Sequence, residues 1–242
     1  MSIKERIIQI KKEIAAAASE CHRKPEDIQL VAVSKKHSVQ RIWTAIQAGV
    51  QTLGENYIQE ARDKIESIGS MIQENPEIHE PSWHFIGHLQ RNKAKYAVRY
   101  FDWIHSVDSQ PLMEEINRCA CKHNKRQKIL IQVSGGERQK SGISPEKVLS
   151  LIETGMMLKN ITICGLMIMP PFTEDPEKSR PYFQNLARLL NHIKEKHPND
   201  PEHPLNQLSM GMTSDFHIAI QEGATFVRVG TAIFGKRESC KT

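Results

Sequence analysis

The feature that most constrains the fold of this chain is a regular alternation of short apolar segments with longer amphipathic ones, repeated from one end to the other. The apolar segments are rich in β-branched and aromatic residues, as buried strands are. Eight strands are predicted, at residues 28–34, 51–53, 83–86, 103–106, 127–133, 161–167, 206–209 and 225–229. Helical spacing of apolar residues predicts helices at 2–20, 38–49, 56–68, 91–100, 109–124, 144–153, 175–196 and 213–222.

Eight β/α units within 242 residues match one kind of α/β fold, the (β/α)8 TIM barrel. A doubly wound sheet is the main alternative, but it usually has fewer strands and a glycine-rich first turn. The first turn here, Ser34-Lys-Lys-His-Ser38, contains no glycine. We therefore predict a single barrel domain over residues 1–242, in which the proline-rich stretches 170–181 and 197–204 are loops.

The composition limits the cellular setting. With 39% hydrophobic and 25% charged residues, the chain is typical of a soluble globular protein. No apolar run approaches the roughly 20 residues that span a bilayer. Residues 1–8 mix charges into a helical pattern, unlike a secretory signal. We expect a cytoplasmic protein with no membrane partner.

Neither metal nor nucleic acid is an expected ligand. The five cysteines form no CxxC pair, and Cys164 lies in an apolar strand, as a small core residue does. His84 and His88 are four residues apart, but Gly87 interrupts the segment and no HExxH pattern exists. The densest basic patch, residues 122–128, lacks an aromatic platform and is explained by a solvated helix end.

A lysine follows the first predicted strand, in Leu30-Val-Ala-Val-Ser-Lys35. A lysine that is desolvated at a strand end becomes nucleophilic enough to form a Schiff base with an aldehyde. Because side chains alternate along a strand, only one of Lys35 and Lys36 faces the barrel mouth, and periodicity does not choose between them. Two solvated lysines at the start of a loop are the alternative explanation.

Hydroxyl and glycine residues follow the last two predicted strands. Ser209-Met-Gly-Met-Thr213 leads into a helix, and Gly230-Thr231 follows the strand that contains Arg228. Backbone N–H and hydroxyl donors at a helix N-terminus suit a phosphate, and TIM barrels often bind phosphates after strands seven and eight. Plain helix capping by Thr213 or Ser214 is the alternative for the first segment. An amine-reactive lysine and a phosphate cradle in one chain together suggest pyridoxal 5'-phosphate (PLP).

Further polar residues lie near the predicted mouth. Asn56, after the second strand, either caps the next helix or hydrogen-bonds a ligand oxygen. Arg228 lies within an apolar strand, where a guanidinium needs a partner. That partner is either a structural carboxylate or the ring nitrogen of a heterocycle bound in the mouth. Gln90, Asn92 and Lys93 are expected at the rim of the site or on a partner surface.

Together these segments resemble the pyridoxal phosphate homeostasis protein family, both in identity and in order. The matching motifs are Ala32-Val-Ser-Lys35, Gly54-Glu-Asn-Tyr57, Trp83-His-Phe-Ile-Gly-His-Leu-Gln-Arg-Asn-Lys93, Gly165-Leu-Met167, Leu208-Ser-Met-Gly-Met212 and Val227-Arg-Val-Gly-Thr-Ala-Ile-Phe-Gly235. The ordered set makes the resemblance specific, although each motif alone is weak. The resemblance implies a single barrel like the N-terminal domain of alanine racemase.

The resemblance also implies roles for the candidate site residues. The PLP lysine of this family is the first lysine after Val-Ser, which selects Lys35 over Lys36. By the same matching, Asn56 lies near the cofactor ring and Arg228 faces the pyridine nitrogen. Four residues would hold the phosphate: Ser209, Thr213, Gly230 and Thr231.

Chemical arguments point away from ordinary catalysis. PLP enzymes that use the ring as an electron sink usually keep its nitrogen protonated with a carboxylate, whereas an arginine leaves the ring neutral. Alanine racemases carry a second acid/base on an additional β domain, for which the eight predicted units leave no residues. We therefore predict a non-catalytic PLP-binding protein that buffers or delivers the cofactor in vitamin B6 homeostasis, with Lys36 assisting transfer.

Other functions stay open at this stage. A PLP-dependent amino-acid racemase with weak activity is the first alternative. A regulatory module that contacts PLP-dependent enzymes or nucleic acid through residues 122–128 is the second. The expected partners are PLP and PLP-dependent apo-enzymes, and the expected state is a monomer or a weak homodimer that binds no nucleic acid.

Overall fold

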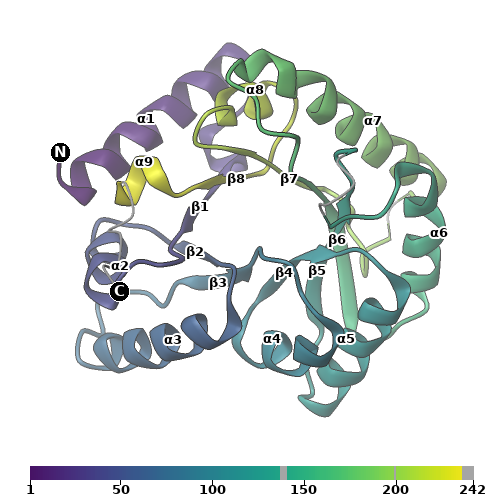
Figure 1. Cartoon of the computed structure of the whole chain (residues 1–242), viewed down its shortest axis with the longest axis horizontal. Helices are drawn as coiled ribbons and strands as arrows, with labels where there is room; N and C mark the ends of the chain where they lie inside the picture. Colours follow the sequence, from purple (N-terminus) through teal and green to yellow (C-terminus); the bar gives the residue numbers. More distant parts are fainter. Residues whose placement is uncertain (137–140, 199, 236–242) are drawn as a thin grey trace.

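The computed structural model describes residues 1–136, 141–198 and 200–235, and within them eight parallel strands form a closed barrel (Figure 1). Each strand pairs with its neighbours in chain order, and the last pairs with the first. The strands are β1 (Gln29–Val33), β2 (Thr52–Glu55), β3 (Ser82–Phe85), β4 (Trp103–Val107), β5 (Gln127–Val133), β6 (Ile161–Ile168), β7 (Gln207–Met212) and β8 (Phe226–Val229). The predicted TIM barrel and all eight of its strands are confirmed.

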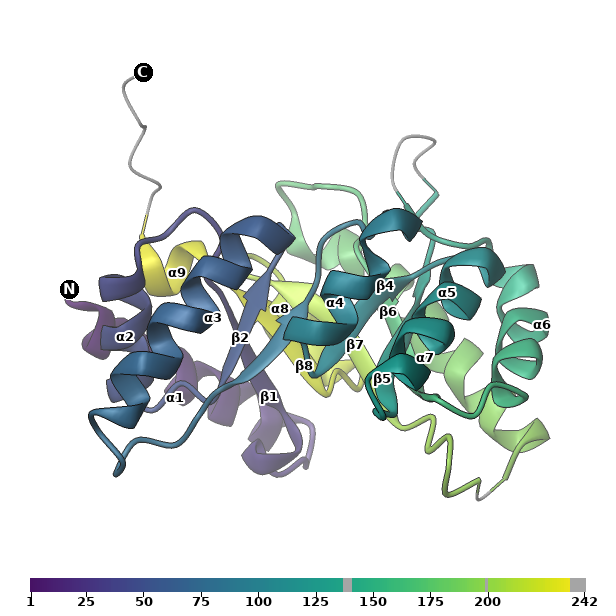
Figure 2. The same cartoon turned by 90° about the horizontal axis from the view of Figure 1, so that it is seen from below.

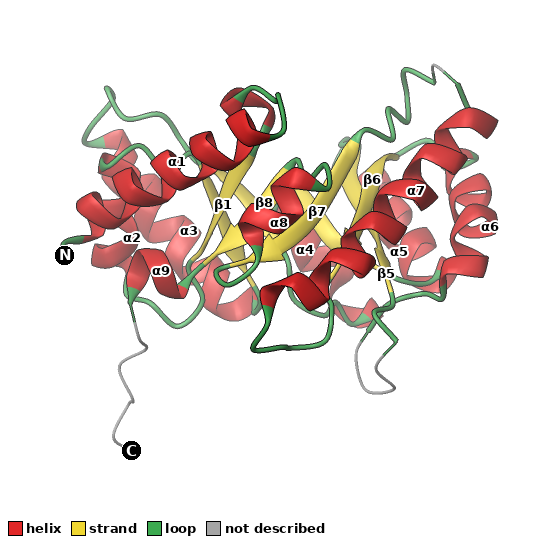
Figure 3. Ribbon diagram, turned by 90° about the horizontal axis from the view of Figure 1, so that it is seen from above, coloured by secondary structure: helices red, strands yellow, loops and turns green. Residues whose placement is uncertain are grey.

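Helices lie between the strands and cover the outside of the barrel (Figure 3). They are α1 (Ile3–Glu20), α2 (Val39–Gln47), α3 (Ile58–Gln73), α4 (Ala94–Tyr100), α5 (Gln110–Lys122), α6 (Pro145–Met156), α7 (Arg180–Lys196), α8 (Phe216–Gln221) and α9 (Thr231–Phe234), with short 3₁₀ turns at Pro25–Asp27, Arg91–Lys93 and Pro176–Ser179. In the described ranges, none of these helices combines the length and apolarity that a bilayer crossing requires.

Some element boundaries differ from those predicted. Helix α3 extends beyond its predicted end because Ile72 continues its apolar stripe against the core. Strand β7 extends to Met212, and α8 begins only at Phe216, because the Asp215 carboxylate accepts the Met212 N–H at 2.7 Å and holds a turn between them. The single turn of α9 was not predicted, since four residues are too few to show a helical period.

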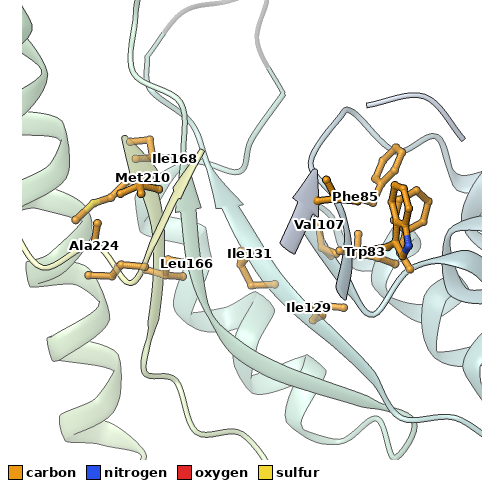
Figure 4. Packing of buried hydrophobic residues seen from close by; sticks show 14 of the residues in the cluster. Trp83, Phe85, Val107, Ile129, Ile131, Leu166, Ile168, Met210 and Ala224 are labelled. Carbon is orange, nitrogen blue, oxygen red and sulfur yellow. The ribbon is translucent and has the colours of Figure 1, made fainter. Parts of the chain in front are cut away.

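The two faces of the strands form separate apolar cores. Residues that face outward, such as Ile129 and Leu166, pack against the helices in the large cluster of Figure 4. A smaller cluster fills the barrel interior: Val31, Leu130, Cys164, Met167 and Phe226. Cys164 is the small core residue that its apolar strand predicted, and burial raises the pKa of its thiol to about 12.

Helix α1 connects the first and the last β/α units of the barrel. Helix α1 begins with a capping box, in which Ser2 and Glu5 exchange hydrogen bonds between side chain and backbone. It then packs against α2, α8 and α9, so the first and last units support each other (Figure 1). Because all strands are parallel, the loops that follow them lie on one face of the molecule (Figure 2). That face contains the candidate site.

Candidate functional site

Four adjacent strands bring most of the predicted site residues to one mouth. The strands β7, β8, β1 and β2 are consecutive around the barrel. Lys35 follows β1 and Asn56 follows β2, whereas Thr213 follows β7. Gly230 follows β8 and packs directly on β1, because a Cβ built on it would lie 3.3 Å from the carbonyl oxygen of Val33. The residue spacing and the closed sheet therefore place these groups side by side.

The structure separates the two lysines that follow β1. Val31 lies in the interior cluster, and the alternation of β1 continues through Val33 to Lys35 on the same side. Lys36 instead adopts a left-handed φ of 61°, and its N–H donates to the carboxylate of Glu60 on α3. Lys35 is half-buried and Lys36 is exposed. The geometry favours Lys35 as the amine at the mouth, and its reactivity stays a prediction.

A buried ionic group, here called the lysine cluster, supports this turn from outside the barrel and consists of Lys64, Glu55, Glu60 and Ser34. Lys64 Nζ donates to Glu55 Oε1 at 2.6 Å, to Glu60 Oε1 at 2.7 Å and to the Ser34 carbonyl at 2.7 Å. Lys64 is only 5% exposed and Glu55 is fully buried, so burial raises the pKa of the Glu55 carboxyl while the Lys64 charge opposes this shift. Because Ser34 immediately precedes Lys35, the cluster fixes the backbone from which that amine projects.

Asn56 does not cap the helix that follows it. The residue before α3 is Tyr57, and no side chain caps the helix there. Within the described part of the chain, the Oδ1 atom of Asn56 is buried and lacks a hydrogen-bond partner. Gly87 of the next loop packs tightly on this residue, since a Cβ there would lie 2.4 Å from the Asn56 carbonyl oxygen. A buried, unpaired amide oxygen is costly unless a ligand satisfies it, so Asn56 suits a ligand-binding role.

The segments after β7 and β8 offer donors at adjoining strand ends. Thr213 and Thr231 are exposed, and Gly230 is half-buried. Neither of the predicted caps opens α8, because Asp215 takes the capping position and accepts the N–H of Met212. The Thr213 hydroxyl is therefore not used to begin the helix. This arrangement fits a phosphate between the two strand ends, as the sequence predicts.

Arg228 begins a continuous series of hydrogen bonds through the barrel. This interior chain connects six side chains, Arg228, Ser209, His105, His84, Ser82 and Asp102. The successive donor–acceptor distances are 2.6, 2.9, 3.0, 3.1 and 3.0 Å. The interior chain starts on β8 near the mouth and ends where β3 and β4 begin, at the opposite face of the barrel.

The two ends of the interior chain determine where its protons lie. Arg228 can only donate, and the carboxylate at the other end can only accept. Arg228 donates to Ser209, and because the Ser82 hydroxyl must donate to the Asp102 carboxylate, neutral imidazoles require the Ser209 hydroxyl to donate to Nδ1 of His105. His105 therefore carries its proton on Nε2 and donates to Nδ1 of His84, whose own Nε2–H donates to Ser82. The Ser82 hydroxyl completes the series at the carboxylate, and every group is satisfied with both imidazoles neutral.

Burial keeps the two histidines neutral and leaves the arginine charged. It lowers the pKa of His84 to about 3, with the charge of Lys128 adding to the effect. It also lowers the pKa of His105 well below the ordinary value, with His84 and Arg228 contributing. The pKa of Arg228 falls to about 10, again through burial, while Asp215 opposes the shift. At neutral pH the interior chain thus has one arrangement of its protons.

The protein partners of Arg228 in the described structure are neutral. Its NH1 group donates to the hydroxyl of Ser209 at 2.6 Å, and its NH2 group donates to the carbonyl of Ile168 at 2.9 Å. Ser209 is fully buried, and its hydroxyl already accepts from Arg228 and donates to His105. A contact between Ser209 and a phosphate stays a prediction, and the hydroxyl would have to leave one of these partners to make it.

Two buried residues beside the site were not predicted from the sequence. His105 lies two residues after Trp103 on β4, on the face that alternation sends into the barrel, and a polar residue there was the available signal. Lys64 lies on the apolar stripe of α3, three residues after Ala61 and four before Ile68. A lysine on that stripe requires buried partners, which is the signal that would have revealed the lysine cluster.

The remaining polar motifs have structural partners. His84 belongs to the interior chain, whereas His88 shares a 2.7 Å hydrogen bond with Ser141. Among the described residues, no three His, Cys, Asp or Glu side chains are grouped as a metal ion requires. In the basic patch, Lys125 donates to the carbonyl of Phe101 at 2.6 Å, so part of its charge caps a helix end.

Comparison with known proteins identifies the class of protein to which this barrel belongs. The family model described as alanine racemase, N-terminal domain, matches residues 8–238. The pyridoxal phosphate homeostasis protein of Vibrio alginolyticus is 38% identical over 238 residues, which cover 98% of this chain and 98% of that protein. This chain therefore belongs to the pyridoxal phosphate homeostasis protein family.

Solved structures agree with this assignment. PipY of Synechococcus elongatus PCC7942, solved with PLP bound, superposes with a TM-score of 0.79 at 34% identity and covers 97% of this chain and 100% of that one. Alanine racemase of Clostridium difficile 630 superposes with a TM-score of 0.65 at 15% identity and covers 100% of this chain and 58% of that one. The second likeness concerns the fold alone.

Proposed function

We propose that this protein binds PLP as a Schiff base on Lys35 and acts in vitamin B6 homeostasis, buffering or delivering the cofactor. Membership in the family and the PLP in the related PipY structure support the proposal. The observation that carries it is the convergence on one mouth of half-buried Lys35, the unpaired amide oxygen of Asn56 and the charged Arg228. We take residues 1–242 as one PLP-binding domain, of which residues 137–140, 199 and 236–242 lie outside the described part.

The residues of the mouth fit the parts of PLP by position. The Lys35 amine would attack the aldehyde carbon and form a C=N bond, and the aldehyde oxygen would leave as water with both amine hydrogens. The Oδ1 atom of Asn56 would accept a hydrogen bond beside the ring. Phosphate oxygens would be held by Thr213, Gly230 and Thr231 at the adjoining ends of β7 and β8.

The arginine argues for a carrier rather than an enzyme. PLP supplies an electrophilic carbonyl, and it becomes a strong electron sink only when its ring nitrogen is protonated. Arg228 stays charged and can only donate, so it would hydrogen-bond an unprotonated nitrogen. Ser209 and the neutral interior chain offer no proton to change this state. We propose a non-catalytic role on these grounds.

Delivery requires that the cofactor can leave. Water reverses a Schiff base and regenerates the amine and the aldehyde, so PLP-dependent apo-enzymes are the recipients we propose. Lys36 is exposed next to Lys35, and we propose that its amine assists the transfer. We propose that the protein does this in the cytoplasm as a monomer or weak homodimer, without binding nucleic acid.

The decisive experiment is a visible absorption spectrum of the protein with PLP, followed by borohydride reduction and peptide mass mapping. We expect a Schiff-base absorption band and a reduced adduct on Lys35. The Lys35→Ala variant should lose both, whereas Lys36→Ala, altered one residue away, should keep both. An adduct on Lys36, or one scattered over surface lysines, would refute the proposed site.

Two further measurements test the role. Exchange of the α-proton of amino acids in deuterated water should be absent across a panel, and sustained exchange that depends on Lys35 would establish the racemase alternative. Transfer of PLP to an apo-enzyme should be slower for Lys36→Ala than for the wild type. Equal rates would remove Lys36 from the transfer step.

A further inference from the structure

A groove with a volume of about 630 Å³ lies outside the barrel, beside α3 and α4. Its walls carry four aromatic rings, those of Tyr57, Phe85, Tyr96 and Tyr100, and we call it the aromatic groove. Cavities that bind small molecules span roughly 300–1,000 Å³ and are lined mainly by aromatic and apolar side chains with a few polar groups. The aromatic groove has the size and the lining of such a site.

The aromatic rings form a fixed floor and reachable walls. Phe85 is 1% exposed and packs edge-on against Phe101, with ring centroids 5.2 Å apart. Tyr96 and Tyr100 are one helical turn apart on α4, so they share a face of that helix. Tyr57 and Tyr96 are 51% and 38% exposed, which leaves part of each ring open to a ligand, although Lys93 and Lys95 place their ammonium groups 5.8 and 4.8 Å from the centre of the Tyr96 ring. A flat ring fits between such walls, because aromatic groups pack well by offset stacking or edge contacts.

The charge of the aromatic groove is positive. Arg62 on α3 and Lys93 before α4 lie on its two sides, and none of the described residues that line it is a carboxylate. Arg62 donates to its neighbour Asp63 at 2.8 and 3.0 Å, but both side chains are exposed, and a surface pair of this kind contributes little to stability. The guanidinium is therefore available to an incoming anion, for which its planar donors are well suited.

We propose that the aromatic groove binds a planar aromatic carboxylate. The carboxylate would lie between Arg62 and Lys93, and the ring would pack against Tyr96 and Tyr100. Asn56 lines the groove and also belongs to the proposed PLP site, so the two sites adjoin but use different charged residues. The proposal does not depend on PLP binding.

Titration with benzoate, followed by ligand-detected NMR on the full chain, tests the proposal. We expect a dissociation constant of about 1 mM, in keeping with the affinity that nine non-hydrogen atoms can supply. Benzamide, which has the same shape without the charge, should bind at least about fivefold more weakly. Cyclohexanecarboxylate, which has the charge without the aromatic ring, should also bind at least about fivefold more weakly.

Variants assign the binding to the groove. Arg62→Gln and Tyr96→Ala should each weaken benzoate binding about fivefold or more. Both side chains are exposed, so their loss should leave the fold intact. Arg188→Gln is the matched control, since Arg188 is an exposed helical arginine on α7 with a local partner. It should leave the affinity unchanged.

Several results would overturn the proposal. These are no benzoate binding up to about 10 mM, a concentration well above the expected dissociation constant, equal binding of benzamide, or the same loss in Arg188→Gln as in Arg62→Gln. A dimer in sedimentation experiments that Tyr96→Ala dissociates would also overturn it, by assigning the groove to a second copy of the chain. The titration is run on PLP-free and PLP-loaded protein, so a failure of PLP binding leaves this test intact.

Discussion

Two buried polar networks lie beside the mouth, and they satisfy their charges in opposite ways. The interior chain has a cation at one end, a carboxylate at the other and neutral groups between them. The lysine cluster instead places one cation, Lys64, within 2.6 and 2.7 Å of two carboxylates. One network depends on the direction of hydrogen bonds, and the other depends on direct contacts between opposite charges.

The two networks support different parts of the proposed site. The interior chain lies under Arg228, and its groups keep the same protonation over the neutral range because burial lowers the pKa of both histidines. The lysine cluster lies under the turn of Lys35 and contains Glu55, a carboxyl whose pKa burial raises. The pyridine end of the proposed site thus has a neutral support, and the aldehyde end has an ionic one.

Removing the cation of the lysine cluster should have the largest effect on stability. Lys64→Met leaves the fully buried Glu55 carboxylate beside Glu60 without its cation, and we expect the free energy of unfolding to fall by about 3–5 kcal/mol in urea denaturation. Adding Glu55→Gln to this variant should restore part of the loss. A loss below about 1 kcal/mol would mean that water or rearrangement satisfies the carboxylates, and the contrast with the interior chain would disappear.

Lowering the pH should change the contributions of the two networks to the free energy of unfolding in opposite directions. A base whose pKa is lowered in the folded state contributes stability that is complete above its unfolded pKa and is lost as pH falls below it. From pH 7.5 to 5.5, His84 and His105 together should lower the free energy of unfolding by about 2.5 kcal/mol, and His203, whose pKa burial also lowers, acts in the same direction. The raised pKa of Glu55 acts in the opposite direction, since the folded state then takes up a proton more readily as pH falls.

Urea unfolding at the two pH values measures the net change. Nitrogen-15 NMR of the imidazoles reports the protonation of the folded state directly. Both rings of the interior chain should remain neutral with the proton on Nε2 at pH 5.5. Titration of either ring near pH 6.5 in the folded protein would contradict the neutral assignment.

Interrupting the interior chain of hydrogen bonds should lower the free energy of unfolding less than interrupting the lysine cluster does. Ser209→Ala removes the hydroxyl that Arg228 and His105 share, and we expect a loss of about 2 kcal/mol, typical of buried polar groups left unpaired. Weaker PLP binding should accompany it, because Arg228 loses the partner that orients it. Ser106→Ala is the control, since the Ser106 hydroxyl is buried without a partner in the described structure and its removal should cost little. Equal losses for the two variants would deny the interior chain any role of its own.

The smallest effect is expected at the turn itself. Lys36 has a left-handed φ of 61°, which glycine adopts without strain. Lys36→Gly should therefore raise the free energy of unfolding by about 0.5–1 kcal/mol, while Lys36→Ala, which keeps the strain, should not. A gain in both variants would place the effect in the charge rather than in the backbone.

The sequence predicted the barrel because the information for it is local. Each strand is marked by its own apolar run, and each longer helix by its own period, so apart from the short α9 only boundaries differed. One boundary mattered: the predicted seventh strand ended at Ser209, whereas β7 continues to Met212, and Ser209 therefore lies inside the barrel rather than at the end of the strand. The order of the strands was also enough to bring Lys35 and Gly230 together.

The supports of the site could not be predicted in the same way. The link between His105 and Ser209 joins β4 to β7 across the barrel interior, and no periodicity within either strand reveals which side chains meet there. The choice between Lys35 and Lys36 depended on backbone torsions in a turn, for which the sequence alone had only the family resemblance. Contacts across the barrel and turn geometry are tertiary properties, and a local pattern does not contain them.

The interior chain extends from the mouth to the opposite face of the barrel, where it ends at Asp102. Asp102 is exposed at the face where strands begin, a face that TIM barrels use for stability rather than chemistry. Its Oδ2 atom accepts both the Ser82 hydroxyl at 3.0 Å and the Trp83 N–H at 2.8 Å, so Asp102→Ala removes the acceptor that fixes the proton order of the interior chain. Through the hydrogen bond between Ser209 and Arg228, we expect this remote substitution to change how firmly the arginine of the proposed site is held, although no residue of the mouth is altered.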